Sequence, residues 1–478
     1  MEVDPSLNLI PDNINHIHLM GICGTGVGAL AGMLKEAGYE VTGSDQQVYP
    51  PMSDFLDDCG IAVHEGYSPA NLQPLPDLVV VGNVITRSNP EAEALAEAAI
   101  PYVSMPQALA HFFIKDSTSL VVTGTHGKTT TSSILASLLD TAGKAPGFMI
   151  GGLVKAFGRN FNLGNGDCFV VEGDEYDTAF FDKGPKFLHY RPSTAIITSI
   201  EFDHADIYAD LEAVKRSFRR LVEIMPEDGC LVAHLDDPVV REVVAGAACR
   251  VLGYGQGKDN DWVIADVRVG SERTAFKVFR KGEFFGEFEN VLPGIHNGLN
   301  SLAVIAVLDR LGLSAETISD GFRSFEGVRR RQEVRGIARG VTVIDDFAHH
   351  PTAVRETLAA LRDAYVGRRL IAVFEPRTNS SRRRVFQDAY VECFDCADLV
   401  LVREPQPLAN VPEEARFSSA ELVGELSAKG ITAHYFNDTD KIINFLLENC
   451  KQGDVAAILS NGGFDDIHKR LLAGLRQS

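Results

Sequence analysis

The sequence contains no continuous run of about 18 apolar residues, which a membrane-spanning helix would need. Its first residues, from Met1 to Pro5, also lack the basic and then apolar order of a secretory signal peptide. With 45% hydrophobic and 23% charged residues, the composition is typical of a globular protein with large buried cores. We therefore expect a cytoplasmic protein without a role at a membrane.

Cysteine is scarce and scattered. The eight cysteines show neither the spacing of a disulfide framework nor that of a zinc site. Cys393 and Cys396 form a lone C-x-x-C pair within an expected helix. Because no second pair accompanies them, we interpret them as half-buried thiols without a redox or metal role.

Positive charge is also in deficit, since the formal net charge is −20 at pH 7. Long-range repulsion would oppose binding to nucleic acids and to anionic membranes, so neither is an expected partner. A negatively charged substrate would need local cationic sites, and the arginine runs 329–331 and 382–384 are candidates. Either run could instead be a solvated helix face.

The length of 478 residues predicts roughly three domains of about 150 residues each. Short apolar runs alternate with helical stretches, which is typical of an α/β fold with parallel sheets. Strands are expected at 16–20, 39–45 and 78–82, then from 119 and at 168–172 and 194–198, and finally at 341–345, 370–374, 399–402 and 455–459. Residues 262–291 alternate like antiparallel strands, and 294–312 indicate a buried helix.

A glycine turn follows the first expected strand, with the pattern Gly24-x-Gly26-x-x-Ala29, and Asp45 ends the second strand. This spacing is typical of dinucleotide-binding enzymes, but the signal is weak. The backbone N–H groups of such a turn bind any diphosphate, including the pyrophosphate of a UDP-sugar. The turn could also serve only to pack a helix closely on a strand.

A second loop decides between these readings. It contains a lysine between a glycine and a threonine pair, and its residues are Gly124, Thr125, His126, Gly127, Lys128, Thr129 and Thr130. Such a loop surrounds phosphate oxygens with N–H groups, while the lysine adds charge and the first threonine can bind Mg²⁺. Val122 stands where the common form has its first glycine, so the loop is a shortened relative. Two diphosphate sites in one chain indicate a ligase or a kinase rather than a dehydrogenase.

Acidic residues follow the next strands of this central region. The segment 172–177 holds four carboxylates, and Glu201-Phe202-Asp203-His204 follows the strand at 194–198. Both should lie at the carboxyl edge of the sheet, near the phosphates. Thr129, Glu172 and His204 are candidate Mg²⁺ ligands, although His204 alone could be a capping or core histidine.

Two further groups of polar residues stand out. Asn297 and Asn300 share one face of an expected helix and could bind an adenine edge or a phosphate. The strand at 341–345 runs into Asp345-Asp346-Phe347-Ala348-His349-His350-Pro351.

Together these motifs resemble the Mur ligase family of bacterial cell-wall synthesis, in the same order and over essentially the whole chain. The resemblance implies an α/β protein of three domains: an N-terminal Rossmann-like domain that binds a UDP-sugar (1–116), a central P-loop-type ATPase domain (117–330), and a C-terminal Rossmann-like domain that binds the incoming amine (331–478). It also implies ATP and Mg²⁺ as cofactors. Other members use a carbamoylated lysine, for which Lys215 and Arg219 are the nearest, weak counterparts.

The resemblance assigns roles to individual residues. The catalytic set is Lys128, Glu172, His204 and His349, with His350 as an alternative base, and Thr129, Glu172 and His204 are the metal ligands. The ATP site comprises the loop 124–130 with Asn297, Asn300, Arg331 and Asp346. The UDP-sugar site comprises Gly24, Thr25, Gly26, Asp45 and Asn83. The acceptor site comprises Arg377, Asn379, Arg382, Ser460 and Asn461.

Within the family, three stretches favour a member that joins UDP-N-acetylmuramate to the murein tripeptide L-alanyl-γ-D-glutamyl-meso-diaminopimelate in peptidoglycan recycling. They are residues 49–52, the long stretch 180–192, and the pair 375–379 and 460–464. The alternatives are a member that adds L-alanine, which typically has His-Arg where this chain has Arg377-Thr378, and a catalytically silent nucleotide sensor. The oligomeric state stays open.

Overall fold

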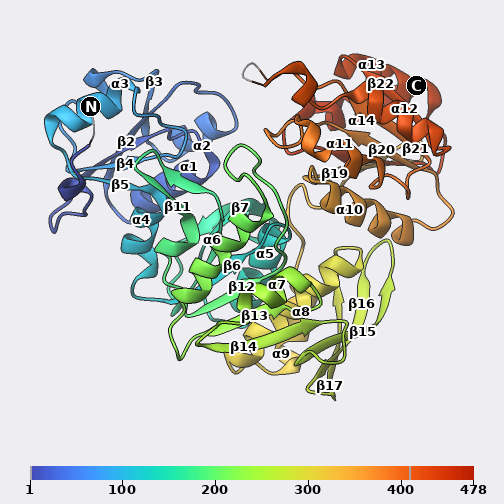
Figure 1. Ribbon diagram of the computed structural model, residues 1–478, viewed down its shortest axis with the longest axis horizontal. Coiled ribbons are helices and arrows are strands. Elements are labelled where there is room, and N and C mark those ends of the chain that lie inside the picture. The colour runs from blue at the N-terminus through green and yellow to red at the C-terminus, as the bar shows by residue number, and fades with distance from the viewer. Residues whose placement is uncertain (1–2, 409–410, 478) are drawn as a thin grey trace. The chain divides into compact units, whose positions relative to one another are not determined.

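The computed structural model describes residues 3–408 and 411–477, which divide into two compact units. Unit 1 consists of residues 3–200, 214–253 and 306–313, and unit 2 of residues 201–213, 254–305 and 314–477 without 409–410. Both units combine sheets with covering helices, as Figure 1 shows. The predicted α/β fold class is therefore confirmed.

Unit 1 begins with a five-stranded parallel sheet in the order β3-β2-β1-β4-β5. Its elements are β1 (His16–Met20), α1 (Thr25–Glu36), β2 (Glu40–Asp45), α2 (Met52–Asp58), β3 (Ala62–Glu65), β4 (Leu78–Val81), α3 (Pro90–Ala98), β5 (Tyr102–Ser104) and α4 (Met105–Leu109). Residues 78–81 are all fully buried, as expected for a strand covered on both faces. The strand order reverses between β1 and β4, and such a switch point opens a ligand crevice at the carboxyl ends of the strands.

The rest of unit 1 is built on a larger sheet in the order β14-β13-β12-β6-β9-β7-β8. Its elements are β6 (Thr118–Thr123), α5 (Lys128–Thr141), β7 (Gly147–Val154), β8 (Arg159–Asn162), β9 (Cys168–Gly173), β12 (Thr194–Ile197), β13 (Cys230–His234), α7 (Pro238–Val244) and β14 (Arg250–Gly255). A small hairpin, β10 (Asp177–Ala179) and β11 (Asp182–Pro185), interrupts the path from β9 to β12. Strand β6 lies between β12 and β9, so the loop after β6 sits at the middle of the sheet edge.

Unit 2 contains the antiparallel strands β15 (Trp262–Val269), β16 (Thr274–Arg280) and β17 (Glu283–Asn290), as predicted. They are followed by α8 (Ile295–Arg310), which continues into unit 1, and by α9 (Ala315–Ser324). Helix α6 (Leu211–Glu223) likewise begins in unit 2 and continues into unit 1.

The C-terminal part of unit 2 has a six-stranded sheet in the order β18-β19-β23-β20-β21-β22, parallel except for β18. Its elements are β18 (Glu333–Ala338), β19 (Val341–Asp346), α10 (Pro351–Ala364), β20 (Leu370–Phe374), α11 (Gln387–Val391), β21 (Leu399–Arg403), α12 (Ser419–Ala428), β22 (Thr432–Phe436), α13 (Thr439–Asn449), β23 (Val455–Leu459) and α14 (Ile467–Gln477). Residues of α10, α11 and α12 bury one face of the sheet, and residues of α13 and α14 bury the other. This is a doubly wound sheet with an antiparallel edge strand.

The predicted helix around the C-x-x-C pair is wrong. Helix α11 ends at Val391, and the chain then turns so that Phe394 becomes fully buried beside Phe374, with ring centroids 5.7 Å apart. Cys393 is buried in this turn and donates its thiol hydrogen to the carbonyl of Tyr390 (3.2 Å). All eight cysteines, which lie within the described ranges, are free.

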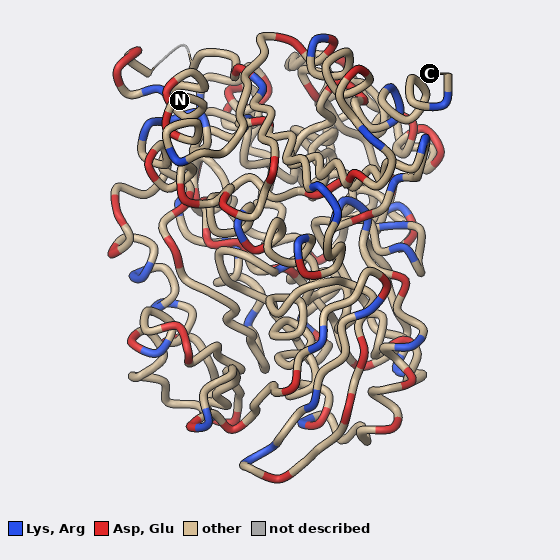
Figure 2. Tube along the Cα trace, turned by 90° about the vertical axis from the view of Figure 1, so that its right-hand side faces the viewer, with Lys and Arg blue, Asp and Glu red and all other residues tan. Residues whose placement is uncertain are grey.

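Charge is distributed evenly along the chain. Figure 2 shows acidic and basic residues interspersed over the whole trace. Within residues 3–408 and 411–477, no helix has both the length and the apolar character that crossing a membrane requires.

Candidate functional site

The glycine turn lies at the switch point of the first sheet. Gly24 caps α1 at the end of the turn that follows β1, and Thr25 begins the helix. Asp45 at the end of β2 accepts a hydrogen bond from the backbone N–H of Cys23 (2.9 Å), which ties the second strand to the turn. Asn83 is exposed just after β4, on the other side of the switch point. The structure thus brings the predicted UDP-sugar residues to one edge.

The phosphate loop joins β6 to α5, whose first residue is Lys128. Gly124 and Gly127 have positive φ angles of 129° and 80°, which favour glycine. A Cβ atom on Gly124 would lie 2.0 Å from the hydroxyl oxygen of Thr198, so a larger residue cannot fit without rearrangement. The predicted strand, loop and helix are all present.

The segment directly after β12 holds this loop from one side. The N–H groups of Thr125 and His126 donate to the carbonyl (2.9 Å) and the hydroxyl (3.1 Å) of Ser199, respectively. The hydroxyl of Thr198 donates to the carbonyl of Thr123 at 3.1 Å. Two N–H groups of the predicted cradle are therefore used to fix the loop. Sequence reasoning missed Thr198 and Ser199, although polar residues at a strand end were the available signal.

Lys128 is almost enclosed. Its Nζ donates to the carbonyl of Gly124 (2.6 Å) and to Oε2 of Glu175 (2.9 Å). Burial lowers the pKa of Lys128, but the carboxylates of Glu175, Asp174 and Glu172 outweigh this effect and raise the pKa above its usual range. Lys128 is therefore a permanent positive charge at the start of α5.

Two of the three proposed metal ligands lie side by side. The hydroxyl of Thr129 donates to Oε2 of Glu172 (3.2 Å), and the N–H of Gly151 donates to Oε1 of the same carboxylate (2.6 Å). The neighbouring strands β6 and β9 place them, with Val122 paired to Glu172. Hydroxyl and carboxylate oxygens are the hard donors that Mg²⁺ prefers, so these residues fit that ion.

His204, the third proposed ligand, belongs to unit 2, and its joining the other two stays a prediction. It has a φ of 53°, an uncommon backbone conformation for a residue with a side chain. Its N–H donates to the carboxylate of Asp203 (2.6 Å). Burial would raise the pKa of Asp203, but His204, His350 and His349 outweigh it and lower that pKa.

Asn297 and Asn300 are buried on one face of α8. The amide of Asn297 donates to the carbonyl of Pro293 (2.8 Å) and to the side-chain oxygen of Gln332 (2.9 Å). The N–H of Gln332 in turn donates to Asp346 (2.7 Å). The predicted residues Asn297 and Asp346 are thus linked through Gln332, which sequence reasoning did not select.

Asp346 is the last residue of β19 and is 5% exposed. Burial raises the pKa of this carboxyl, although Arg331 and backbone N–H groups oppose the shift. The guanidinium of Arg331 lies over the ring of Phe347, 4.8 Å from its centroid. Both predicted residues therefore flank the turn that follows β19.

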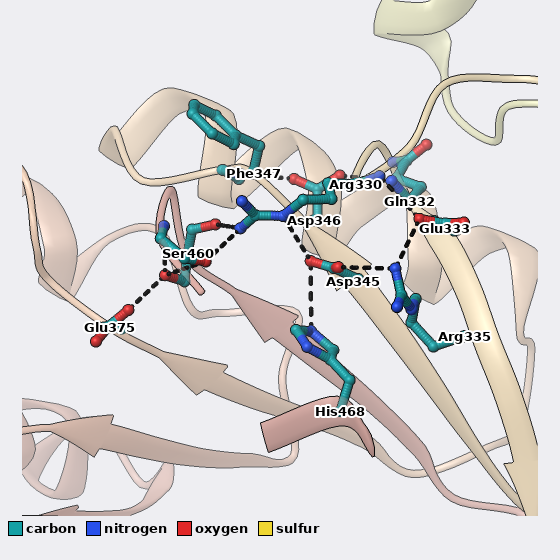
Figure 3. Close-up of polar contacts among 12 residues, drawn as sticks. Arg330, Gln332, Glu333, Arg335, Asp345, Asp346, Phe347, Glu375, Ser460 and His468 are labelled. Atoms are coloured by element: carbon teal, nitrogen blue, oxygen red, sulfur yellow. Dashed lines mark hydrogen bonds and ion pairs between the residues drawn. The ribbon is translucent and has the colours of Figure 1, made fainter. Parts of the chain in front are cut away.

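Arg330 is a functional candidate that sequence reasoning passed over in favour of its neighbour. Figure 3 shows its guanidinium reaching the loop after β23, where it donates to the carbonyls of Ser460 and Gly462 (both 2.6 Å). Its Nε also lies 3.5 Å from Asp345, which His468 approaches to 3.3 Å. Arg330 thereby fixes the predicted acceptor loop.

The predicted acceptor residues form two groups in unit 2. The hydroxyl of Ser460 donates to Glu375 (2.5 Å), and the side chain of Arg377 packs against Gly462, where an added Cβ would lie 1.7 Å from the guanidinium. Asn461 has a buried side-chain oxygen without a hydrogen-bond partner among the described residues.

The second group connects the C-terminal sheet with residues 201–213 of the same unit. Arg382 donates to the side-chain oxygen of Asn379 (3.2 Å), and Asn379 donates to Asp206 (3.0 Å). The N–H of Ala205 donates to the hydroxyl of Ser380 (3.1 Å). The segment that carries His204 is therefore held against the predicted acceptor residues.

The two adjacent histidines differ in their bonding. His349 has Nδ1 3.0 Å from the carbonyl of Phe347, so Nδ1 must carry the hydrogen. His350 is buried at the start of α10, where Nδ1 accepts from the N–H of Thr352 (3.3 Å) and Nε2 donates to the carbonyl of Phe202 (3.2 Å). His350 acts as a helix cap.

The weak counterparts of a carbamoylated lysine are both engaged elsewhere. Lys215 and Arg219 form ion pairs with Glu242 at 2.6 and 2.7 Å.

Three family models match the chain. They are the Mur ligase family, catalytic domain (residues 16–116), the Mur ligase middle domain (122–308) and the Mur ligase, glutamate ligase domain (330–462). Together they account for most of the chain.

Curated relatives and solved structures match over nearly the full length. A UDP-N-acetylmuramate--L-alanyl-gamma-D-glutamyl-meso-2,6-diaminoheptandioate ligase of Escherichia coli is 41% identical, with 96% of this chain and 98% of the relative covered. A UDP-N-acetylmuramate--L-alanine ligase of Syntrophomonas wolfei is 35% identical, with 97% of each covered. The crystal structure of a murein peptide ligase from Psychrobacter arcticus aligns with a TM-score of 0.72 at 34% identity, covering 97% of this chain and 99% of the other.

Proposed function

The chain belongs to the Mur ligase family, and from this premise we propose that it joins UDP-N-acetylmuramate to the tripeptide L-alanyl-γ-D-glutamyl-meso-diaminopimelate. It is an ATP-dependent ligase that forms ADP. The observation that carries the choice of acceptor is the full-length identity of 41% to a relative named for this tripeptide. The assignment places the reaction in peptidoglycan recycling.

The chemistry requires activation of a carboxylate. The lactyl carboxylate of the muramate is a poor electrophile, so ATP first transfers its γ-phosphoryl group to a carboxylate oxygen, giving an acyl phosphate and ADP. The free amine of the tripeptide then attacks the carbonyl carbon through a tetrahedral intermediate. Loss of inorganic phosphate and of the amine proton leaves the new amide bond.

We propose that the phosphate loop binds ATP and that Lys128 contacts the β- and γ-phosphates. The permanent positive charge of Lys128 and its place at the N-terminus of α5 support this role. Thr129, Glu172 and His204 would hold Mg²⁺, which would neutralise phosphate charge when bound. Asn297, Asn300, Arg331 and Asp346 would also contact the nucleotide.

The turn 24–26 with Asp45 and Asn83 would bind the UDP-sugar, because these residues share the switch point of the first sheet. The matching functional divisions are 1–116 for the UDP-sugar, 117–330 for ATP and 331–478 for the acceptor. Since ATP and a UDP-sugar are both supplied in the cytoplasm, we propose that location.

A site that binds a tripeptide with three carboxylates needs cationic and hydrogen-bonding side chains. Arg377 and Arg382 would bind carboxylates, because guanidinium groups match them bidentately. Asn379, Ser460 and Asn461 would bind the peptide backbone. The side-chain oxygen of Asn461, buried without a protein partner among the described residues, is suited to accept a peptide N–H.

His349 is our candidate for the base that takes the amine proton. Its Nδ1 carries a hydrogen directed at a backbone carbonyl, so in the neutral ring Nε2 is the nitrogen that can accept a proton.

The experiment that tests this function follows phosphate release by the purified protein with UDP-N-acetylmuramate, ATP and Mg²⁺. Release with the tripeptide but not with L-alanine is expected. Release only with L-alanine would assign the activity named for the Syntrophomonas wolfei relative, and release with neither would favour a silent nucleotide sensor.

A further inference from the structure

The lysine of the phosphate loop, Lys128, forms a buried ion pair. The Nζ of Lys128 lies 2.9 Å from Oε2 of Glu175, and the two side chains are 12% and 2% exposed. Glu175 comes three residues after Glu172, on the segment that leaves β9. A carboxylate so fully buried is uncommon unless an opposite charge accompanies it.

The segment that carries Glu175 is anchored from behind by a second lysine. The Nζ of Lys186 lies 3.1 Å from Oδ2 of Asp174 and 4.2 Å from the ring centroid of Tyr176. The backbone N–H of Lys186 also donates to the carbonyl of Asp174 (3.1 Å). The two neighbours of Glu175 are thus both fixed, and Glu175 is held in place toward Lys128.

The hairpin between these anchors is fixed as well. Its turn holds Phe180 and Phe181, and the ring of Phe181 lies 4.8 Å from that of Tyr102, edge to face. Both phenylalanines pack on the apolar cluster of the first sheet. The segment from Glu175 to Lys186 is therefore held at both ends and at its tip. These contacts fix the position of Glu175 beside Lys128.

Charge disfavours the presence of Glu175 and a phosphate on the same lysine. The two lysines do not offset the three carboxylates of Glu172, Asp174 and Glu175, and ATP with one Mg²⁺ adds further negative charge. In a buried site, like charges at contact distance strongly disfavour one another. A phosphate that approaches Lys128 is therefore repelled by the carboxylate of Glu175 and competes with it for the lysine.

We propose that Glu175 is an internal stand-in for the terminal phosphate of the nucleotide: its carboxylate pairs with Lys128 until a nucleotide phosphate displaces it. This inference rests on the proposed function, because it concerns the same ATP site. The stand-in keeps the buried lysine paired and makes every nucleotide compete with a carboxylate. It sets the nucleotide affinity below the value that the loop alone would give.

The test measures binding of ATP by calorimetry with a chelator present to remove Mg²⁺, for the wild type and Glu175→Gln. Close buried charge pairs are coupled strongly enough that removing the competitor should lower the Kd by about tenfold or more. The matched control is Glu36→Gln, the same chemical change at an exposed ion pair with Arg159 in the same unit (2.5 Å), which should leave the Kd unchanged.

Thermal stability gives a second readout with a distinctive sign. Without nucleotide, Glu175→Gln should melt below the wild type, because Lys128 loses its partner. With saturating ATP, the increase in Tm should exceed that of the wild type, because the phosphate restores a partner to the lysine. If Glu175 had only a structural role, Glu175→Gln would lower the Tm both without nucleotide and with saturating ATP.

An unchanged or raised Kd in Glu175→Gln, with wild-type ATP binding intact, overturns the stand-in role and leaves the proposed function standing. Absence of ATP binding in the wild type and in both variants, in the presence of Mg²⁺ as well as in its absence, would instead contradict the proposed function. If Glu175→Gln does not fold, Glu175→Asp replaces it in the test, because this variant withdraws the carboxylate by one methylene. The Kd for ATP should again fall, but by a smaller factor. An unchanged Kd in that variant equally overturns the inference.

Discussion

Adjacent residues in this chain have different tasks because their hydrogen-bond partners differ. His349 directs Nδ1–H at a backbone carbonyl, whereas His350 uses both ring nitrogens to join the start of α10 to residue 202. Arg330 and Arg331 both lie over the ring of Phe347, but Arg330 also donates to the carbonyls of Ser460 and Gly462 and so fixes the loop after β23. Residue type alone does not separate such neighbours.

The histidine pair gives a first prediction. His349→Gln should lower kcat by about a hundredfold or more, the usual contribution of a positioned base, with little change in Tm. His350→Gln should chiefly lower Tm, because it disturbs the cap of α10. Steady-state kinetics and thermal unfolding of both variants check this. Equal kinetic defects in the two variants would contradict the assignment of the base.

Lys128 gives a second prediction. Lys128→Ala should abolish phosphate release, because no other residue of the loop supplies a charge to the phosphates. The variant should fold but melt at a lower temperature, since Glu175 loses its partner. Lys277→Ala, which removes an exposed pair with Asp266 at 2.7 Å, is the matched control and should keep full activity. Retained turnover in Lys128→Ala would contradict the role of the loop.

Asp345 gives a prediction about pH. Burial raises the pKa of this carboxyl, but His468, whose Nε2 lies 3.3 Å from it, and the guanidinium groups of Arg330 and Arg335 outweigh burial and lower the pKa. A group with a depressed folded-state pKa stabilises the fold above its unfolded pKa of about 3.9 and loses this effect as the pH falls through the folded value.

Wild type should therefore be more stable than Asp345→Asn at neutral pH, and the difference should shrink below about pH 4. Urea unfolding across the pH range measures it. Asp140→Asn, at an exposed position of α5, is the control and should show no such difference. A stability difference that grows on acidification would have the wrong sign.

At the scale of elements, the turn between β6 and α5 depends on one glycine. Gly124 has a φ of 129° and would place a Cβ 2.0 Å from the hydroxyl of Thr198. Gly143, just after α5, also has a positive φ (72°), but nothing lies within 4 Å of its Cβ position. The two glycines flank the same helix, α5, and form a natural pair for comparison.

Gly124→Ala should abolish nucleotide binding, because the clash of the new Cβ with Thr198 displaces the loop. Gly143→Ala should cost only about 1 kcal/mol of stability, the price of a left-handed alanine, and should bind nucleotide normally. Calorimetric titration with ADP and urea unfolding check both variants. Normal binding by Gly124→Ala would show that the loop tolerates displacement.

The elements also show what could be predicted from the sequence. The short segments at 16–20, 119–123 and 341–345, which are rich in apolar residues, all lie in strands, as expected for strands of a buried sheet. The hairpin β10–β11 was not predicted, since residues 177–185 show no alternation and its stability comes from packing on a distant sheet. The helix predicted around Cys393 fails because burial of Phe394 overrides local helix propensity.

At the scale of the whole molecule, the motif residues predicted from the sequence are distributed over both units. Lys128, Thr129 and Glu172 belong to unit 1, and His204 and Asn297 belong to unit 2. The motifs could be found from the sequence because each sits at the end of an element. Their partners, such as Gln332 for Asn297 and Arg330 for the loop after β23, could not, because they depend on contacts between residues far apart in the chain.

The choice of the tripeptide as acceptor distinguishes this ligase from members of the family that add L-alanine. The most direct test supplies equal concentrations of tripeptide and L-alanine together with UDP-N-acetylmuramate, ATP and Mg²⁺, and determines the mass of the UDP-linked product. We predict that the product carries the complete tripeptide in large excess over single alanine. A product that carries mainly one alanine would contradict the account.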